Sequence, residues 1–147
     1  MTEILDRIAI FQLINAYSHF ADRREPKKQS ELFTSDATIE VYQGEPDKNK
    51  PIQILRGQKE FEEGFAGLNQ YDTTTHFNGQ STITINNNTA TGETYCLAHH
   101  VQTKQEQRTL LVMSIRYYDT FIKQNDSWFF SERKLIIDWT DSRLSMP

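Results

Sequence analysis

Hydrophobic positions in the first part of the chain recur every three or four residues. Ile10, Ile14 and Tyr17 show this spacing, which is typical of one buried face of a helix. The pattern predicts an amphipathic helix over residues 2–22, with Thr2 as its N-cap. The other positions that follow the helical spacing are Ile4, Ile8, Phe11, Leu13 and Phe20.

Alternation of apolar and polar residues takes over in the second half of the chain and indicates strands. Short polar runs separate these segments and predict turns. The long strands are expected at residues 73–85, 89–103, 108–123 and 127–139. Between the first helix and these strands, the sequence predicts a helix over 28–33, a turn at Ser35-Asp36, strands at 38–42 and 52–55, and a helix over 57–68.

The order of these elements, with helices first and strands afterwards, indicates an α+β fold. Four consecutive strands joined by short turns are most simply an antiparallel meander. A curved sheet of this kind, wrapped over the first helix, would enclose a pocket at its open end. Residues 43–51 predict a loop, and the sequence leaves open whether that loop closes over the pocket. A chain of this length without a linker or repeat is expected to form one domain, residues 1–147.

Two of the predicted strands carry distinctive faces, because successive side chains point to opposite sides of a sheet. One face of the first strand is polar and carries His76, Asn78, Gln80, Thr82 and Thr84. One face of the next strand is mostly small and carries Gly92, Thr94, Cys96, Ala98 and His100. Small side chains would leave room for a ligand, whereas the polar face could instead be exposed to solvent.

The net charge of −4 gives no electrostatic reason to expect nucleic acid, which favours a basic face. The single cysteine, Cys96, excludes an internal disulfide. No apolar stretch is long enough to span a bilayer, and the N-terminal residues lack the basic and apolar regions of a signal peptide. These features predict a cytoplasmic protein with no nucleic-acid or membrane partner.

The candidate chemistry lies in His76 and His100, on successive strands joined by a turn at residues 86–88. Asp22, at the end of the first helix, is a candidate third member. Histidine titrates near neutral pH, so such a pair can remove a proton and return one. Each histidine could instead be a satisfied structural residue. The same three residues could form an iron-binding triad, but the short ligand spacing of such sites is missing and no metal site is predicted.

Several segments around these candidates resemble a known family. The segments are YSHFAD with Tyr17 and Asp22, TTHFNG with His76, LAHH with His100, and WFFSERKLIIDW at the end. Together with the element order, they are similar to the SnoaL-like, nuclear transport factor 2-like family. Within it, the chain looks most like the scytalone dehydratase and bile-acid 7α-dehydratase branch. The resemblance implies a cystatin-like cone, with N-terminal helices on a curved, mainly antiparallel sheet that encloses a pocket.

The resemblance also implies roles for the candidates. It makes His76 and His100 the acid–base pair and Asp22 the carboxylate that orients and charges a histidine. The family reaction is an elimination of water next to a carbonyl without metal, so no cofactor is expected. A homodimer or higher homo-oligomer, formed through the outer face of the sheet, is also implied.

The chain departs from the dehydratase pattern in its polar groups. Two tyrosines of the dehydratase correspond here to Ala21 and to Val41, with Tyr42 beside it. A polar pair on a later strand corresponds to the region of Ile115 and Tyr117. Scytalone itself is therefore not the expected substrate.

The leading hypothesis is a cofactor-free lyase or isomerase acting on a small, cyclic or polycyclic carbonyl compound. One histidine, charged or oriented by Asp22, would take a proton α to the carbonyl, and the other would protonate a leaving hydroxyl or return the proton. Tyr17 would hold the developing enolate. The expected substrate-binding residues are Tyr42, Asn78, Cys96 and Tyr117. The alternative is a non-catalytic ligand-binding or assembly domain of the same fold.

Other notable residues are expected to have structural roles. Arg116 and Arg133 could bind an anion, but solvated or interface positions are favoured for both. Trp128 and Trp139 are expected to pack against the sheet. His19 is expected on the helix surface, and His99 on the sheet face opposite His100.

Overall fold

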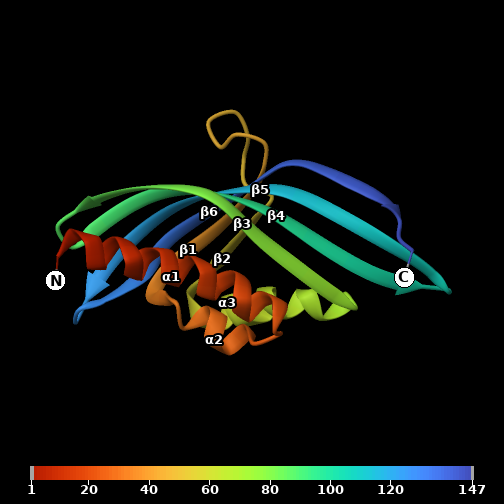
Figure 1. Ribbon diagram of the computed structural model, residues 1–147, viewed down its shortest axis with the longest axis horizontal. Coiled ribbons are helices and arrows are strands. Elements are labelled where there is room, and N and C mark those ends of the chain that lie inside the picture. The colour runs from red at the N-terminus through yellow and green to blue at the C-terminus, as the bar shows by residue number, and fades with distance from the viewer. Residues whose placement is uncertain (1, 147) are drawn as a thin grey trace.

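In the computed structural model, which describes residues 2–146, the helices lie under one long, curved sheet (Figure 1). The helices are α1 (Glu3–Asp22), α2 (Pro26–Ser30), α3 (Gly57–Phe65) and the 3-10 helix η1 (Ala66–Gln70). The strands are β1 (Phe33–Gln43), β2 (Gln53–Arg56), β3 (Thr73–Asn86), β4 (Thr89–Lys104), β5 (Gln107–Gln124) and β6 (Ser127–Leu144). The helices of residues 2–146 cover the concave face of the sheet, and the β1–β2 loop projects from the other face (Figure 1).

The sheet has the strand order β2-β1-β6-β5-β4-β3. Strands β3 to β6 form an antiparallel meander, as predicted, and β1 joins β6 in parallel. Two of the hairpins turn through paired left-handed residues, Gln105-Glu106 and Asn125-Asp126. Turns of this hand match the right-handed twist of the flanking strands. The α+β class and the helix-on-curved-sheet cone are therefore confirmed.

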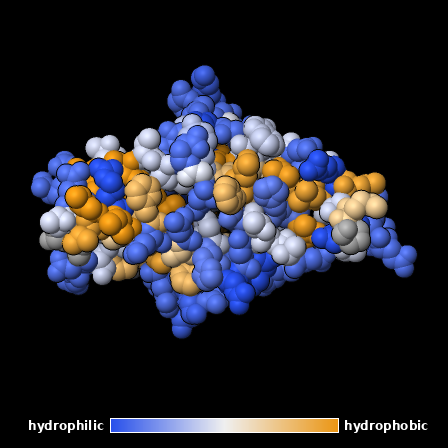
Figure 2. Space-filling model, viewed as in Figure 1, coloured by the Kyte–Doolittle hydropathy of each residue, from blue (hydrophilic) through white to orange (hydrophobic). Residues whose placement is uncertain are grey.

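Helix α1 carries two apolar stripes, one formed by Ile10, Ile14 and Tyr17 and the other by Ile4 and Ile8, and only the first packs against the sheet. Ile10, Ile14 and Tyr17 are buried, whereas Ile4 is 71% and Ile8 48% exposed. At 100° per residue, the second stripe lies roughly 140° around the helix from the first, so one sheet face cannot cover both. Figure 2 shows the resulting hydrophobic surface near the start of α1.

Several predicted boundaries are wrong. Helix α2 begins at Pro26 and ends at Ser30, because proline is favoured at the first position of a helix. The turn predicted at Ser35-Asp36 does not form, because both residues lie within β1. The pairing of β1 with β6 instead changes register between Phe33 and Thr38. Helix 57–68 is divided into α3 and η1, and β6 continues to Leu144.

The polar face predicted for β3 does not continue along the strand. His76 and Asn78 are partly buried, but Gln80, Thr82 and Thr84 are exposed. The register shifts between Asn78 and Ser81, and a shift of one residue moves every later side chain to the other face. Ile83 therefore takes the buried side.

The core contains a fully buried ion pair, which corrects the solvated or interface position expected for Arg133. Arg133 donates from Nε and Nη2 to Asp119, both at 2.8 Å. Its guanidinium lies about 4 Å from the ring centroids of Tyr17, Tyr117 and Phe130. Arginine tolerates such burial because its flat cation can stack on rings while it pairs with a carboxylate.

The two tryptophans differ in position. Trp128 is buried, and its indole N–H donates to Asp6, so it packs between the sheet and α1 as expected. Trp139 is 52% exposed, which corrects the packed position expected for it. It pairs across the sheet with Ser114, on the face away from the helices.

Candidate active site

A cavity of about 290 Å³ lies between the helices and the concave face of the sheet. Its walls come from every helix and strand described above, and most of them are apolar. The polar groups that line it are Tyr17, Gln29, Gln53, Gln70, Tyr71, His76, His100 and Tyr117. Among the apolar ones are Ala21, Val41, Leu55, Phe65, Leu68, Met113 and Leu135. A mostly apolar cavity with a few convergent polar groups is the usual form of a small-molecule site.

Asp22 and His76 form a hydrogen-bonded pair at the edge of this cavity. Asp22 is the last residue of α1, and His76 lies near the start of β3. Nδ1 of His76 is 2.7 Å from Oδ1 of Asp22, and the His76 backbone N–H donates to Oδ2 at 3.0 Å. An ionised carboxylate only accepts, so Nδ1 carries the proton and Nε2 is free for a ligand.

The charge of Asp22 is held by these contacts. Partial burial raises the pKa of Asp22, but the hydrogen bonds from the His76 side chain and backbone and from Thr74 outweigh it. The net pKa lies below the ordinary value, and the carboxylate is ionised at neutral pH. The Asp22 carboxylate therefore fixes the orientation of the His76 ring through two hydrogen bonds.

His100 lies on the neighbouring strand, with its ring centroid 5.9 Å from that of His76. Burial, and then the nearby charge of His76, lower the pKa of His100 below its ordinary 6.5. Its Nδ1 is 3.4 Å from the carbonyl oxygen of Leu111, which places the proton on Nδ1 and the lone pair on Nε2. His100 is therefore neutral at pH 7 and can accept a proton.

Tyr17 and Tyr117 both line the cavity. Their rings pack edge to face, with centroids 5.8 Å apart. Burial raises the pKa of Tyr17 and raises that of Tyr117 further, so both phenols keep their protons. A neutral phenol in such a place can donate a hydrogen bond to a ligand oxygen.

Three of the expected substrate-binding residues do not line the cavity. Tyr42 points to the other face of the sheet, where its hydroxyl donates to Glu40, while its neighbour Val41 lines the cavity. Asn78 donates to Asn15 on α1 and lines a separate hollow that it shares with Asp22 and His76. Cys96 is packed in the core, and burial raises the pKa of its thiol to about 11.

Two neighbours of the histidines were missed in the sequence. Tyr71 lines the cavity, with its ring centroid 4.7 Å from that of His100. Thr74 is buried and donates from Oγ1 to Asp22 at 2.9 Å. Thr74 could have been found, because it lies two residues before His76 and so shares its strand face.

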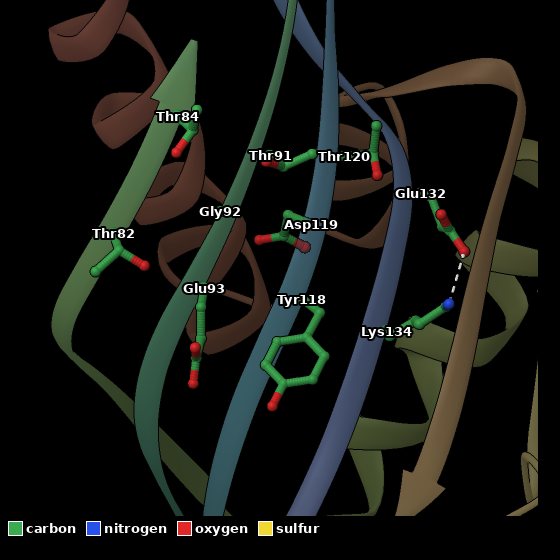
Figure 3. Close-up of a pocket in the computed structure, with 10 residues that line it drawn as sticks. All are labelled: Thr82, Thr84, Thr91, Gly92, Glu93, Tyr118, Asp119, Thr120, Glu132 and Lys134. Carbon is green, nitrogen blue, oxygen red and sulfur yellow. Dashed lines mark ion pairs between the residues drawn. The ribbon is translucent and has the colours of Figure 1, made fainter. Parts of the chain in front are cut away.

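Another hollow, of about 380 Å³, lies on the opposite face of the sheet (Figure 3). Its walls are largely threonine, with Glu93, Tyr118, Glu132 and Lys134 around them, and α1 lies behind the sheet in this view. It contains no histidine or cysteine. The Asp22–His76 pair and His100 instead border the cavity on the concave side.

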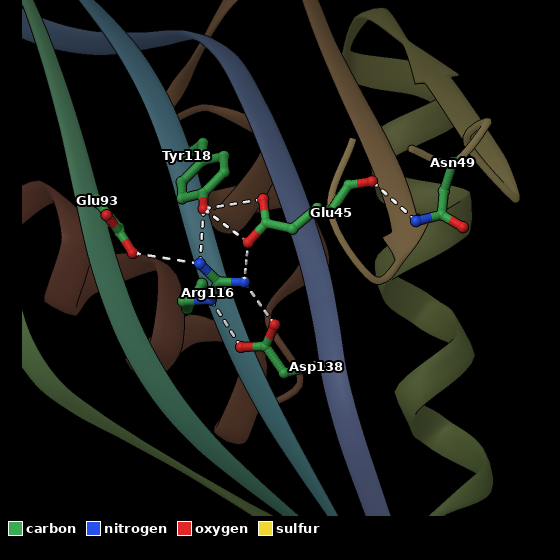
Figure 4. Close-up of polar contacts among 6 residues, drawn as sticks. All are labelled: Glu45, Asn49, Glu93, Arg116, Tyr118 and Asp138. Carbon is green, nitrogen blue, oxygen red and sulfur yellow. Dashed lines mark hydrogen bonds and ion pairs between the residues drawn. The ribbon is translucent and has the colours of Figure 1, made fainter. Parts of the chain in front are cut away.

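The loop between β1 and β2 is bound to the outer face of the sheet, so it does not cover the cavity as a lid. Glu45 accepts from Nη2 of Arg116 at 2.5 Å, and Arg116 also donates to Asp138 (Figure 4). The loop backbone is joined to β6 by the N–H of Gly44, which donates to Ile137 at 3.0 Å. The loop is thus held on the side away from the cavity. Arg116, expected to be solvated or at an interface, is engaged by carboxylates.

Among residues 2–146, no three side chains of the histidine, cysteine, aspartate and glutamate types are grouped so that they could hold a metal ion. Within the same residues, no helix is both long and apolar enough to cross a membrane.

A family model for the SnoaL-like domain matches residues 2–134 of this sequence. The chain therefore belongs to the SnoaL-like domain family, within the nuclear transport factor 2-like superfamily, as the sequence motifs indicated. No curated protein sequence matches the chain significantly.

Solved structures share the fold over nearly the whole chain. A candidate scytalone dehydratase from Novosphingobium aromaticivorans is 23% identical, with a TM-score of 0.81 and coverage of 98% of this chain and 93% of that one. A type 2 hexachlorocyclohexane dehydrochlorinase, LinA, has a TM-score of 0.81 at 14% identity, over 97% and 92% of the chains. A protein with a cystatin-like fold from Nostoc punctiforme has a TM-score of 0.72 at 23% identity, over 94% of each chain.

Proposed function

We propose that this protein is a cofactor-free lyase or isomerase that acts on a small cyclic or polycyclic carbonyl compound. The observation that carries the proposal is the Asp22–His76 pair beside His100 at one apolar cavity. Among the structural neighbours, one is named as a candidate dehydratase and another as a dehydrochlorinase, and both names describe eliminations. Their similarity supports the fold, and the site residues support the chemistry.

The two histidines lie in different surroundings, and this difference supports separate roles for them in acid–base catalysis. Burial keeps His100 neutral, whereas His76 is hydrogen-bonded to the Asp22 carboxylate, which can balance a positive charge on the imidazole during the reaction. A pair of titratable groups with opposed environments supplies one acid and one base at the same pH. His100 is then the base and His76 the acid.

In the proposed elimination, Nε2 of His100 takes the proton α to the carbonyl. The electrons of that C–H bond form an enolate, whose oxygen accepts a hydrogen bond from the Tyr17 phenol. As the enolate collapses to the conjugated carbonyl, the bond to the β-hydroxyl breaks. His76 delivers its Nε2 proton to the departing oxygen, so water leaves. An isomerase would share the removal of the α proton and the enolate, and would then return a proton to another carbon instead of releasing water.

The experiment that tests this function is dehydration of a panel of cyclic β-hydroxy ketones, followed by the absorbance of the conjugated product. His76→Gln and His100→Gln should each lower kcat by roughly 10²–10⁴-fold, the usual contribution of acid–base catalysis. His19→Gln is the matched control, because His19 is exposed on α1. Turnover that persists unchanged in both site variants would contradict the mechanism.

The alternative function is binding without chemistry, and the apolar walls of the cavity favour it as the second candidate. A binding domain would retain a hydrophobic cyclic ligand unchanged, with the histidines as polar contacts only. Recovery of the intact ligand after prolonged incubation, together with tight binding, would support this alternative over the lyase.

We also propose a homodimer formed through the outer face of the sheet. Phe77, Leu97 and Trp139 lie in one cross-strand row there, connected through Ser114, and are 69%, 41% and 52% exposed. Exposed apolar rows of this kind are typical of subunit contacts. Light scattering should give twice the 17.2 kDa chain mass, and Leu97→Lys should shift it to one chain mass. A 17.2 kDa species in the unmodified protein would contradict the dimer.

A further inference from the structure

Arg24, two residues after the end of α1, has an unusual backbone conformation for a residue with a side chain. Arg24 adopts a left-handed backbone, with φ of 58°. Its N–H donates to Ala21 O at 3.2 Å, and the N–H of Glu25 donates to Phe20 O at 3.0 Å. These two bonds form the motif that commonly closes helices, in which the left-handed position is usually glycine. A residue with a Cβ is strained there, so the Arg24 side chain needs an explanation.

The guanidinium of Arg24 reaches the candidate active site. Nη1 donates to the Ala21 carbonyl and to Oγ1 of Thr74, each at 2.8 Å. Thr74 is only 5% exposed, and it lies directly opposite His100 in the β3–β4 pairing. The arginine is therefore connected to the strands that carry both histidines.

The chemistry of the guanidinium decides which group donates in each hydrogen bond between Arg24, Thr74 and Asp22. A guanidinium can only donate, so the Thr74 oxygen accepts from Arg24. The single hydroxyl proton of Thr74 is then available to Asp22, whose Oδ1 is 2.9 Å away. Asp22 thereby receives three donors, the Thr74 hydroxyl and the backbone N–H and Nδ1–H of His76.

We propose that Arg24 is a positioning residue, which acts through Thr74 to fix the Asp22 carboxylate and, with it, the ring of His76. The network runs from Arg24 through Thr74 and Asp22 to His76, and every link is 2.9 Å or shorter. Its effect on catalysis rests on the function proposed above, but its effect on the Asp22 carboxylate does not.

The charges that face this network are few. Asp22, His76, His100 and Arg24 interact with one another across the α1–β3 contact, and the charge of Arg24 also opposes protonation of His100. Arg23, the adjacent residue, is exposed. Arg23 therefore offers a matched control, because its removal changes the net charge equally.

The test compares Arg24→Gln with Arg23→Gln by NMR, following the carboxyl carbon of Asp22 and the imidazole nitrogens of His100 through a pH titration. Arg24→Gln should raise the pKa of both groups, and Arg23→Gln should leave both as in the unmodified protein. Thr74→Val should raise the pKa of Asp22, and Thr74→Ser should restore it because serine keeps the hydroxyl. The same Asp22 titration in Arg24→Gln and the unmodified protein would overturn the proposal, as would an equal shift in Arg23→Gln.

Folding is monitored by circular dichroism. If Arg24→Gln fails to fold, Arg24→Gly replaces it, because glycine fits the left-handed position without strain. The expected upward shift in the pKa of Asp22 is the same for both variants.

Activity separates this proposal from the proposed function. Arg24→Gln and Thr74→Val should lower kcat by up to about a hundredfold with little change in KM, because a displaced catalytic group slows the transition state. A shift at Asp22 without any effect of His76→Gln on turnover would overturn the proposed acid role of His76 and leave the positioning role of Arg24 intact. Loss of turnover in His76→Gln, with no shift at Asp22 in Arg24→Gln, would do the reverse.

Discussion

Two carboxylates on the concave side of the sheet each pair with a nitrogen-containing side chain, and they do so in contrasting surroundings. Asp119 and Arg133 have fully buried side chains and two 2.8 Å hydrogen bonds, with aromatic rings around the guanidinium. Asp22 and His76 make a 2.7 Å contact, with 25% and 7% of their side chains exposed. The first pair is closed within the core, and the second borders the cavity.

The difference shows how one sheet face can support both stability and chemistry. Arginine stays charged at any physiological pH, so the Asp119–Arg133 pair has no proton to exchange. Histidine exchanges protons near neutrality, so the Asp22–His76 pair can take part in a reaction. We expect changes to the first pair to affect folding and changes to the second pair to affect turnover.

The largest effect is expected from Asp119→Asn, which leaves Arg133 buried without a counter-charge. Removal of one partner from a buried ion pair typically costs about 3–5 kcal/mol of stability. Urea denaturation measures this loss, with Asp36→Asn as the control because Asp36 is exposed on β1. A loss below about 1 kcal/mol would show that the two pairs are not as different as the geometry indicates.

The next effect is expected from Asp22→Asn, and it should appear in turnover rather than in folding. An amide lacks the negative charge and one of the two acceptor oxygens that bind His76, so kcat should fall by about 10²-fold or more, the lower end of acid–base contributions. The stability loss should be smaller than that of Asp119→Asn, because asparagine keeps one acceptor oxygen and water reaches the partly exposed site. Each hydrogen bond lost there contributes at most about 1.5–3 kcal/mol. Paired denaturation and steady-state kinetics on the two variants measure both quantities. Equal losses of stability would remove the contrast between the pairs.

The smallest effect is a pH dependence from His100. Its folded pKa lies below the ordinary 6.5, because burial and then the charge of His76 disfavour the imidazolium. The unfolded chain therefore binds this proton more readily, so the contribution to stability is present above about pH 6.5 and is lost as pH falls toward the folded pKa. Asp22, whose pKa is lowered, loses its own contribution only in the separate window below 3.8.

Urea denaturation at pH 7.5 and pH 5 measures the His100 contribution. The unmodified protein should lose more stability between these pH values than His100→Gln does, whereas His19→Gln should behave like the unmodified protein. Equal losses of stability between the two pH values in the unmodified protein and His100→Gln would contradict the lowered pKa of His100.

Much of the fold could be predicted because the relevant signals are local. The long strands and their turns follow from alternation and turn residues, and the resemblance in YSHFAD, TTHFNG and LAHH indicated the family. Alternation fails to predict the buried face where the strand register shifts. The register shift after Asn78 reverses Gln80, Thr82 and Thr84. Gly79 lies at this shift, and a glycine inside a strand often marks a bulge, but alternation alone carries one face through it.

The site could be predicted only in part, because alternation separates the two faces of a strand but does not identify the face that lines the cavity. It places Val41 and Tyr42 on opposite faces, but the parallel pairing of β1 with β6 decides that Val41 reaches the cavity. Tyr17 and Asp22 are five positions apart, and the end of α1 must reach β3 before Asp22 can meet His76. The role of Arg24 depends on a left-handed backbone that its side chain does not favour.

The most direct test of the shared acid–base site is proton exchange in D₂O. A cyclic ketone without a leaving group is incubated with the protein, and proton NMR follows deuterium incorporation at the carbon α to the carbonyl. The unmodified protein should catalyse the exchange, and His100→Gln and Asp22→Asn should each slow it by about a hundredfold or more. Exchange at the unmodified rate in both variants, with ligand binding confirmed by chemical-shift changes, would contradict the account.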